Sequence, residues 1–127
     1  MAKDDYHVIV FKILVYLYAV FKGKVIFEPD SYDKAINKKD INEEYLLRVY
    51  KMMSDEGYIE KLTFKKVWGG DYIPLFEEYD MRITQKGIQY LEDNDKMKAV
   101  GRFLQDKSDT IIKLLIEIGL KQILQPK

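Results

Sequence analysis

The spacing of apolar residues changes along this chain, and each change predicts a different element. Residues 8–21 are almost all apolar or tyrosine, and Lys12 is their only charged interruption. This pattern predicts a helix covered over most of its circumference, started by Asp4 or Asp5 and stopped by Gly23. Because so small a domain rarely covers a helix on all sides, we expect a partner chain to cover part of it.

The middle of the chain carries the most specific pattern. Asn42 is placed to cap a helix that ends at Gly57, with acids in its first turn. A shorter helix over about residues 31–37 comes before it. The apolar residues of the longer helix recur at i, i+3, i+4 and i+7, which predicts its buried stripe. They are Leu46, Val49, Tyr50 and Met53. The opposite face holds Glu44, Leu47, Arg48, Lys51 and Asp55.

The period then shortens to two, which is typical of half-buried strands. One strand is predicted over residues 58–68 and another over 78–83, and the connection 69–77 is longer and more apolar than a tight hairpin turn. Thr84 is placed to cap the next helix, which runs to about Asp93 and buries Ile88 and Leu91.

This order of elements predicts the fold class. It is mainly α with a small antiparallel β-wing (α+β), a winged helix-turn-helix with extra C-terminal helices. Residues 1–95 form the winged domain in this interpretation. Residues 96–127 form a helical extension that packs on the same domain and dimerises. Its last helix, about 110–124, has so wide an apolar arc that one small subunit hardly hides it.

Composition narrows the choice of function. The 127 residues include 21 basic and 21 acidic side chains, so no global field draws the chain to nucleic acid or to an anionic membrane. There is no cysteine, which suits a reducing cytoplasm. The longest apolar run falls short of the ~18–20 residues that span a bilayer, and we expect no membrane partner.

Enzyme signatures are weak, so we expect no catalytic residue, no metal site and no cofactor. His7 is the only histidine. A single histidine excludes a histidine-based metal cluster, and a serine triad would need His7 itself. His7 is more simply a surface residue at the start of a helix. Gly69-Gly70 lacks the lysine and serine of a phosphate loop and is most simply a turn.

The winged arrangement predicts a surface for double-stranded DNA. The helix of residues 42–56 would enter the major groove with Arg48 and Lys51, its only cations, while other lysines hold phosphates. The phosphate contacts expected are Lys38, Lys39, Lys61, Lys65 and Lys66. The alternative is a mixed-charge surface that does not bind DNA. Acids lie on the same helix face, and lysine on an edge strand also protects against aggregation.

Two further surfaces are expected. The apolar wing tip, Tyr72, Ile73, Leu75 and Phe76, is a candidate contact for a protein partner. A homodimer is expected from the apolar excess of the first and last helices. Its predicted interface is Phe11, Val15, Tyr18, Ile111, Leu114, Leu115 and Ile118.

Two motifs carry a family resemblance. They are Asp55-Glu56-Gly57-Tyr58-Ile59 and Ile83-Thr84-Gln85-Lys86-Gly87-Ile88-Gln89-Tyr90-Leu91. Over about residues 5–95 the chain resembles the YjcQ-like family of small bacterial and phage-associated proteins. The resemblance implies a winged-helix fold and a nucleic-acid or regulatory role. The chain departs from a minimal member in its longer opening helix, apolar wing tip and extra C-terminal helix.

Overall fold

The computed structural model describes residues 5–60, 64–66, 69, 72–74, 78–105 and 110–119. At 64–66, 72–74, 110, 111, 118 and 119 the description covers the backbone alone. The elements in chain order are α1 (Tyr6–Phe21), α2 (Pro29–Ala35), the 3-10 turn η1 (Lys38–Asp40), α3 (Glu43–Asp55), β1 (Ile59–Glu60), β2 (Phe64–Lys66), β3 (Tyr72–Pro74), the 3-10 turn η3 (Glu78–Asp80), β4 (Arg82–Ile83), α4 (Gln85–Asp93), α5 (Asp95–Gln105) and α6 (Thr110–Gly119).

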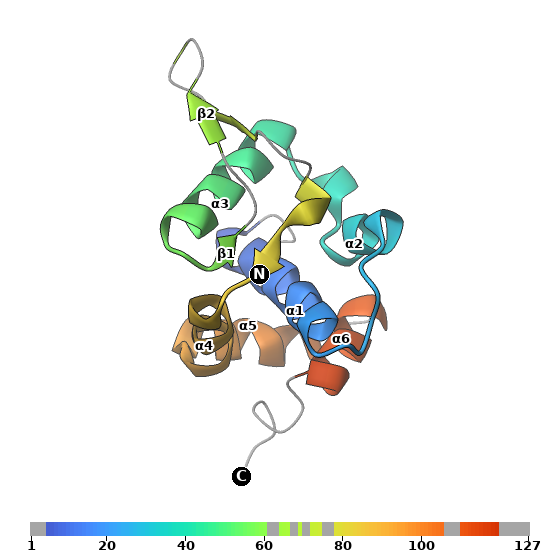
Figure 1. The fold of residues 1–127 in the computed structure, drawn as a ribbon. Coiled ribbons are helices and arrows are strands. Elements are labelled where there is room, and N and C mark those ends of the chain that lie inside the picture. The colour runs from blue at the N-terminus through green and yellow to red at the C-terminus, as the bar shows by residue number, and fades with distance from the viewer. Residues whose placement is uncertain are drawn as a thin grey trace.

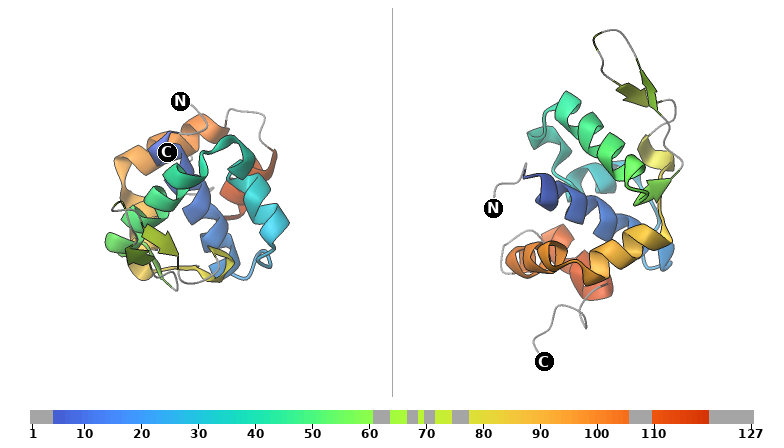
Figure 2. Two further views of the ribbon diagram at one scale, coloured as in Figure 1. Left: turned by 90° about the horizontal axis from the view of Figure 1, so that it is seen from above. Right: turned by 90° about the vertical axis from the view of Figure 1, so that its left-hand side faces the viewer.

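Helix α1 is the central element of the fold. It lies between α2 and α3 on one side and α4, α5 and α6 on the other (Figures 1 and 2), and it contacts all five helices. Every residue from Val8 to Ala19 is buried. A partner chain is therefore not needed to cover residues 8–19, because the later helices of the same chain surround them.

One charged side chain lies inside this apolar helix. Lys12 is only 2% exposed, and its Nζ donates a hydrogen bond to Oδ1 of Asn37. Asn37 follows α2 in the left-handed conformation, with φ 57°, which asparagine tolerates better than most residues. Since a buried charge is costly without polar partners, this bond fixes the end of α2 against the middle of α1.

The helix-turn-helix consists of α2, η1 and α3. Asn42 caps α3 through its side-chain oxygen, which accepts from the backbone N–H of Tyr45 at 3.1 Å. Gly57, with φ 82°, ends the helix in the left-handed conformation. Both predicted ends are confirmed, and so is the buried stripe of Leu46, Val49, Tyr50 and Met53.

In the described residues the strands pair as two short antiparallel ribbons. At the base, β1 pairs with β4, with Ile59 opposite Ile83. Farther out, β2 pairs with β3, with Lys65 opposite Ile73, so part of the predicted long connection is itself a strand. The predicted strand over residues 78–83 is wrong in its first half. Residues Glu78–Asp80 form η3 instead, because the side chains of Glu78 and Tyr79 hydrogen bond to α2, η1 and α3.

The C-terminal helices complete the core. Thr84 caps α4 as predicted, since its Oγ1 accepts from the N–H of Gly87 at 2.9 Å. Asn94 caps α5 by accepting from the N–H of Met97 at 3.1 Å. Helices α5 and α6 then pack against α1 and against each other. Among the described residues, no helix combines the length and the apolarity needed to cross a membrane.

Candidate nucleic-acid interface

Helix α3 presents a mixed-charge outer face. Its buried stripe packs inward, and Glu43, Glu44, Arg48, Met52 and Asp55 are exposed, while Leu47 and Lys51 are half-buried. The sequence pattern missed Met52, whose surface is 51% exposed. Its position one helical turn after Arg48 was the available signal, because residues four apart lie on the same face.

Lys51 is engaged along its own helix. Its Nζ lies 2.5 Å from Oδ1 of Asp55, one turn further on. An ion pair of this kind contributes little stability, but it offsets the positive charge that Lys51 would present to a phosphate. Arg48, on the same face, is exposed.

Lys38 has a different role from the predicted one. Its Nζ hydrogen bonds to Oε1 of Glu78 and lies 4.0 Å from Oδ1 of Asp33. Burial by itself lowers the pKa of Lys38. The hydrogen bond and the negative charge of Glu78 outweigh this effect, so the pKa is raised. Lys38 is therefore an internal ion-pair partner in this structure, contrary to its prediction as a phosphate contact.

Three tyrosines extend this ion pair into a network that joins α2, η1, α3 and η3. Tyr50 Oη donates to Glu78 Oε2 at 2.7 Å, and Tyr32 Oη lies 2.7 Å from Tyr50 Oη. Tyr79 Oη donates to Asp33 Oδ2 at 2.8 Å. Burial raises the pKa of both Tyr32 and Tyr50 well above 10.0, so both hydroxyls keep their protons. The network fixes η3, on the returning side of the wing, against the helix-turn-helix.

Three of the remaining predicted cations lie on η1 and on β2. Lys39 is exposed, next to the engaged Lys38. Lys65 and Lys66 belong to β2, whose partner strand β3 contacts α3. Lys61 lies outside the described residues. The structure therefore brings β2 and the outer face of α3 to the same side of the molecule (Figure 1).

The predicted protein-contact residues are only partly described. Tyr72 and Ile73 belong to β3, where they pair with Lys66 and Lys65. Leu75 and Phe76 lie outside the described residues.

Most residues of the predicted dimer interface are buried inside a single chain. Phe11 and Val15 are 0% exposed, Leu115 is 3% exposed, and Tyr18 is 8% exposed, because all four pack in the core of one chain. That part of the prediction is wrong for this fold. Leu114 is 55% exposed and is available to a partner. Ile111 and Ile118 belong to α6, but the description covers only their backbone.

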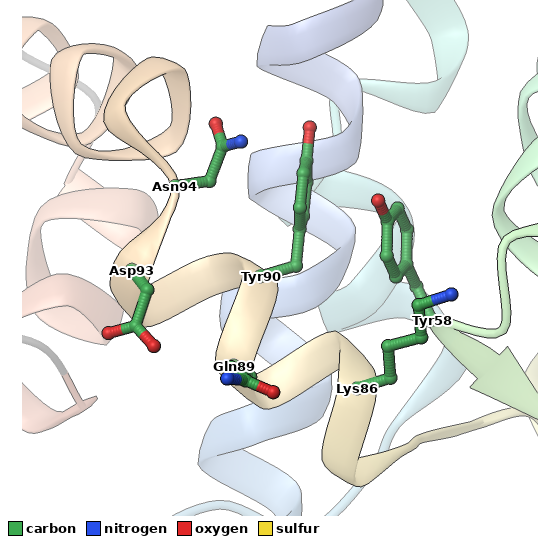
Figure 3. A pocket seen from close by; sticks show the side chains of 6 residues that line it. All are labelled: Tyr58, Lys86, Gln89, Tyr90, Asp93 and Asn94. Carbon is green, nitrogen blue, oxygen red and sulfur yellow. The ribbon is translucent and has the colours of Figure 1, made fainter.

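A second site, which the sequence did not reveal, lies where α3 ends. The rings of Tyr58 and Tyr90 stack with centroids 4.3 Å apart at 17° (Figure 3). They line an open pocket of about 310 Å³ together with Lys86, Gln89, Asp93 and Asn94. Tyr58 and Tyr90 lie in the two motifs noted above, but 31 intervening residues conceal their contact. In the described part of the chain, no group of three or more His, Asp or Glu side chains could hold a metal ion.

Comparison with known proteins adds one finding to this geometry. No curated protein and no solved structure matches the chain. The family model described as YjcQ protein matches residues 11–110, from within α1 to the first residue of α6. The chain, a winged helix-turn-helix with extra C-terminal helices, therefore belongs to the YjcQ family.

Proposed function

We propose that this protein binds double-stranded DNA and acts as a small transcriptional or phage-related regulator. One observation carries the proposal: α3 turns a polar face outward beside a two-stranded ribbon that extends from the helical body (Figures 1 and 2). A duplex major groove admits a helix of this kind, and a wing next to it reaches the adjacent backbone.

The charges on α3 suggest how the helix approaches DNA. Glu43 and Glu44 are exposed in its first turn, where they repel phosphates. Arg48 lies one turn further on, with Met52 beyond it. The middle of α3 therefore suits the groove better than its N-terminus. Arg48 would contact a base edge, and Lys39, Lys65 and Lys66, together with Lys61, would contact the backbone.

A salt titration tests this assignment. Binding of a mixed-sequence duplex is measured by fluorescence anisotropy for the wild type and for Lys61, Lys65 and Lys66 changed together to glutamine. The slope of log K against log salt should fall by ~0.9 for each phosphate that the variant no longer neutralises. Lys96 and Lys113, which are exposed on α5 and α6, are changed to glutamine as the control. An equal slope in the two variants would count against the wing.

A protein-interaction module without nucleic-acid binding is the second candidate. The observation that favours it is that Lys38 pairs with Glu78 and Lys51 pairs with Asp55. These ion pairs offset the charge of two of the cations predicted to contact DNA. In this case the wing tip contacts a protein. Recovery of partners by the wild type is compared with recovery by a variant in which Tyr72, Ile73, Leu75 and Phe76 are all serine. Equal recovery would defeat this second function.

The same proposal includes the setting of the protein. We propose a cytoplasmic homodimer that acts by binding rather than by catalysis and that needs no cofactor. The absence of cysteine from the sequence suits a reducing compartment. The exposed Leu114 on α6 offers an apolar contact for a second copy.

A further inference from the structure

The tyrosine hydroxyls of the described residues differ in how they are bonded. Five of them make hydrogen bonds inside the protein: Tyr16, Tyr18, Tyr32, Tyr50 and Tyr79. Tyr58 and Tyr90 stack on each other, and their hydroxyls make no hydrogen bond to any described residue. Both are partly exposed. Part of each residue therefore lies at the protein surface.

Four polar side chains line the pocket with the two rings (Figure 3). Lys86, Gln89, Asp93 and Asn94 all lie on α4 or directly after it. Lys86 Nζ is 5.9 Å from the centroid of Tyr58 and makes no ion pair with a described residue. Gln89 and Asp93 are exposed. The pocket thus combines an aromatic pair with a cation, a carboxylate and amide groups.

The backbone under the pocket is held closely. Thr84 N–H donates to the carbonyl of Tyr58 at 3.1 Å, and Thr84 Oγ1 donates to the carbonyl of Gly57. Gly87 passes so near Tyr58 that a Cβ at this position would lie 2.3 Å from its carbonyl oxygen. Tyr58 and α4 therefore keep a fixed separation, so the two rings are already in place before any ligand arrives.

We propose that this pocket binds a nucleobase and that Lys86 attracts the phosphate attached to it. Stacking on tyrosine suits any planar base, since every base has a π-face. The carboxylate of Asp93 can accept from an exocyclic amine, and the amides of Gln89 and Asn94 can donate to ring nitrogens or carbonyl oxygens. A volume of about 310 Å³ is at the lower end for ligand pockets, which fits one base better than a larger ligand.

This site is separate from the outer face of α3 and does not depend on duplex binding. Its ligand could be a free nucleotide or a base of a single strand, because both offer the same ring and phosphate. Titrations without duplex DNA distinguish them. The probes are adenosine, adenosine monophosphate and a short oligodeoxyadenylate, each added to the full chain labelled with nitrogen-15.

Saturable shifts are expected for the backbone amides around Tyr58 and along α4. The monophosphate should bind more tightly than adenosine. Similar affinities for monophosphate and oligonucleotide would assign a free nucleotide, and much tighter binding of the oligonucleotide would assign a single strand. The absence of saturable shifts with all three probes would overturn the proposal.

Variants connect the shifts to the pocket. Tyr90→Ala should weaken binding about tenfold, which is ~1.4 kcal/mol, while Tyr90→Phe keeps the stacked ring and most of the affinity. Lys86→Gln should remove the advantage of the monophosphate over adenosine. Because loss of a stacked ring can loosen α4, the exposed Asp93→Ala is a second variant and should weaken binding several-fold. The control is Lys96→Gln on α5. Affinities unchanged by Tyr90→Ala and Asp93→Ala would overturn the assignment.

Discussion

Tyr50 on α3 donates a hydrogen bond to Glu78 on η3, with Oη and Oε2 2.7 Å apart, and this bond joins α3 to the returning side of the wing. Since the single hydroxyl proton of Tyr50 points to Glu78, Tyr32 must donate to Tyr50. Glu78 also accepts from Lys38. The position of the wing base therefore depends on a chain of buried and half-buried polar groups.

Removing the hydroxyl of Tyr50 should destabilise the protein. Tyr50→Phe leaves the hydroxyl of Tyr32 buried without a partner and takes one donor from Glu78. We expect the free energy of unfolding, measured with urea, to fall by about 1–2 kcal/mol. Tyr58→Phe is the matched control, because the hydroxyl of Tyr58 bonds to no described residue, and it should change stability by less than ~0.5 kcal/mol. Equal losses in the two variants would contradict the network.

Lys38 and Lys39 are adjacent in sequence but should behave differently. Lys38→Met removes the cation beside Glu78 and Asp33 and should lower the free energy of unfolding by about 1 kcal/mol, a modest value because its side chain is 35% exposed. Lys39→Met should leave stability unchanged and weaken duplex binding. Urea unfolding and anisotropy on the same two variants provide the comparison. The reverse result would restore Lys38 as a DNA contact.

Strong alkali should unfold the protein through Tyr32 and Tyr50. Burial raises the pKa of both hydroxyls well above 10.0, their ordinary value. The folded state therefore holds these protons more tightly than the unfolded state. The resulting stability is complete below about pH 10 and is lost as the pH rises through the raised folded values. Phenolate absorbance followed together with circular dichroism should show two tyrosines that ionise only on unfolding. Their ionisation in the folded state would refute this assignment.

Gly87→Ala should destabilise α4 although alanine favours helices. The new Cβ would lie 2.3 Å from the carbonyl oxygen of Tyr58 and 2.9 Å from Cγ1 of Ile83. We expect a loss of about 2–3 kcal/mol in urea unfolding, which exceeds the ~1 kcal/mol that alanine adds to a helix. Gly23→Ala meets no atom within 4 Å, has φ 74° and should cost only about 1 kcal/mol. A Gly87→Ala protein as stable as the wild type would show that the two segments can separate.

Self-association should depend on the exposed part of α6. Leu114→Glu places a charge on an apolar contact and should shift the sedimentation of the protein at tens of micromolar from dimer to monomer. Lys113→Gln, at a neighbouring exposed position, is the control and should leave the dimer intact. A wild-type monomer under these conditions would remove the homodimer from the proposed function.

Local signals predicted the helices well. Asn42, Thr84 and Gly57 mark helix ends because capping and left-handed turns depend on a few neighbouring residues. The strand prediction failed at Glu78–Asp80, where an alternating pattern forms a 3-10 turn. The cause is tertiary, since Glu78 and Tyr79 bond to helices about 28 to 46 residues away in sequence.

The sequence by itself determined the order of the helices, the caps of α3 and α4 and the stripe that α3 buries, because these follow from the period of apolar residues and from local backbone chemistry. Only the tertiary structure decided that the later helices of the same chain surround α1, that Lys38 belongs to an internal ion pair, and that Tyr58 stacks on Tyr90. Those outcomes depend on contacts between distant segments. A periodic pattern shows that a face is buried, but it does not show which segment covers it.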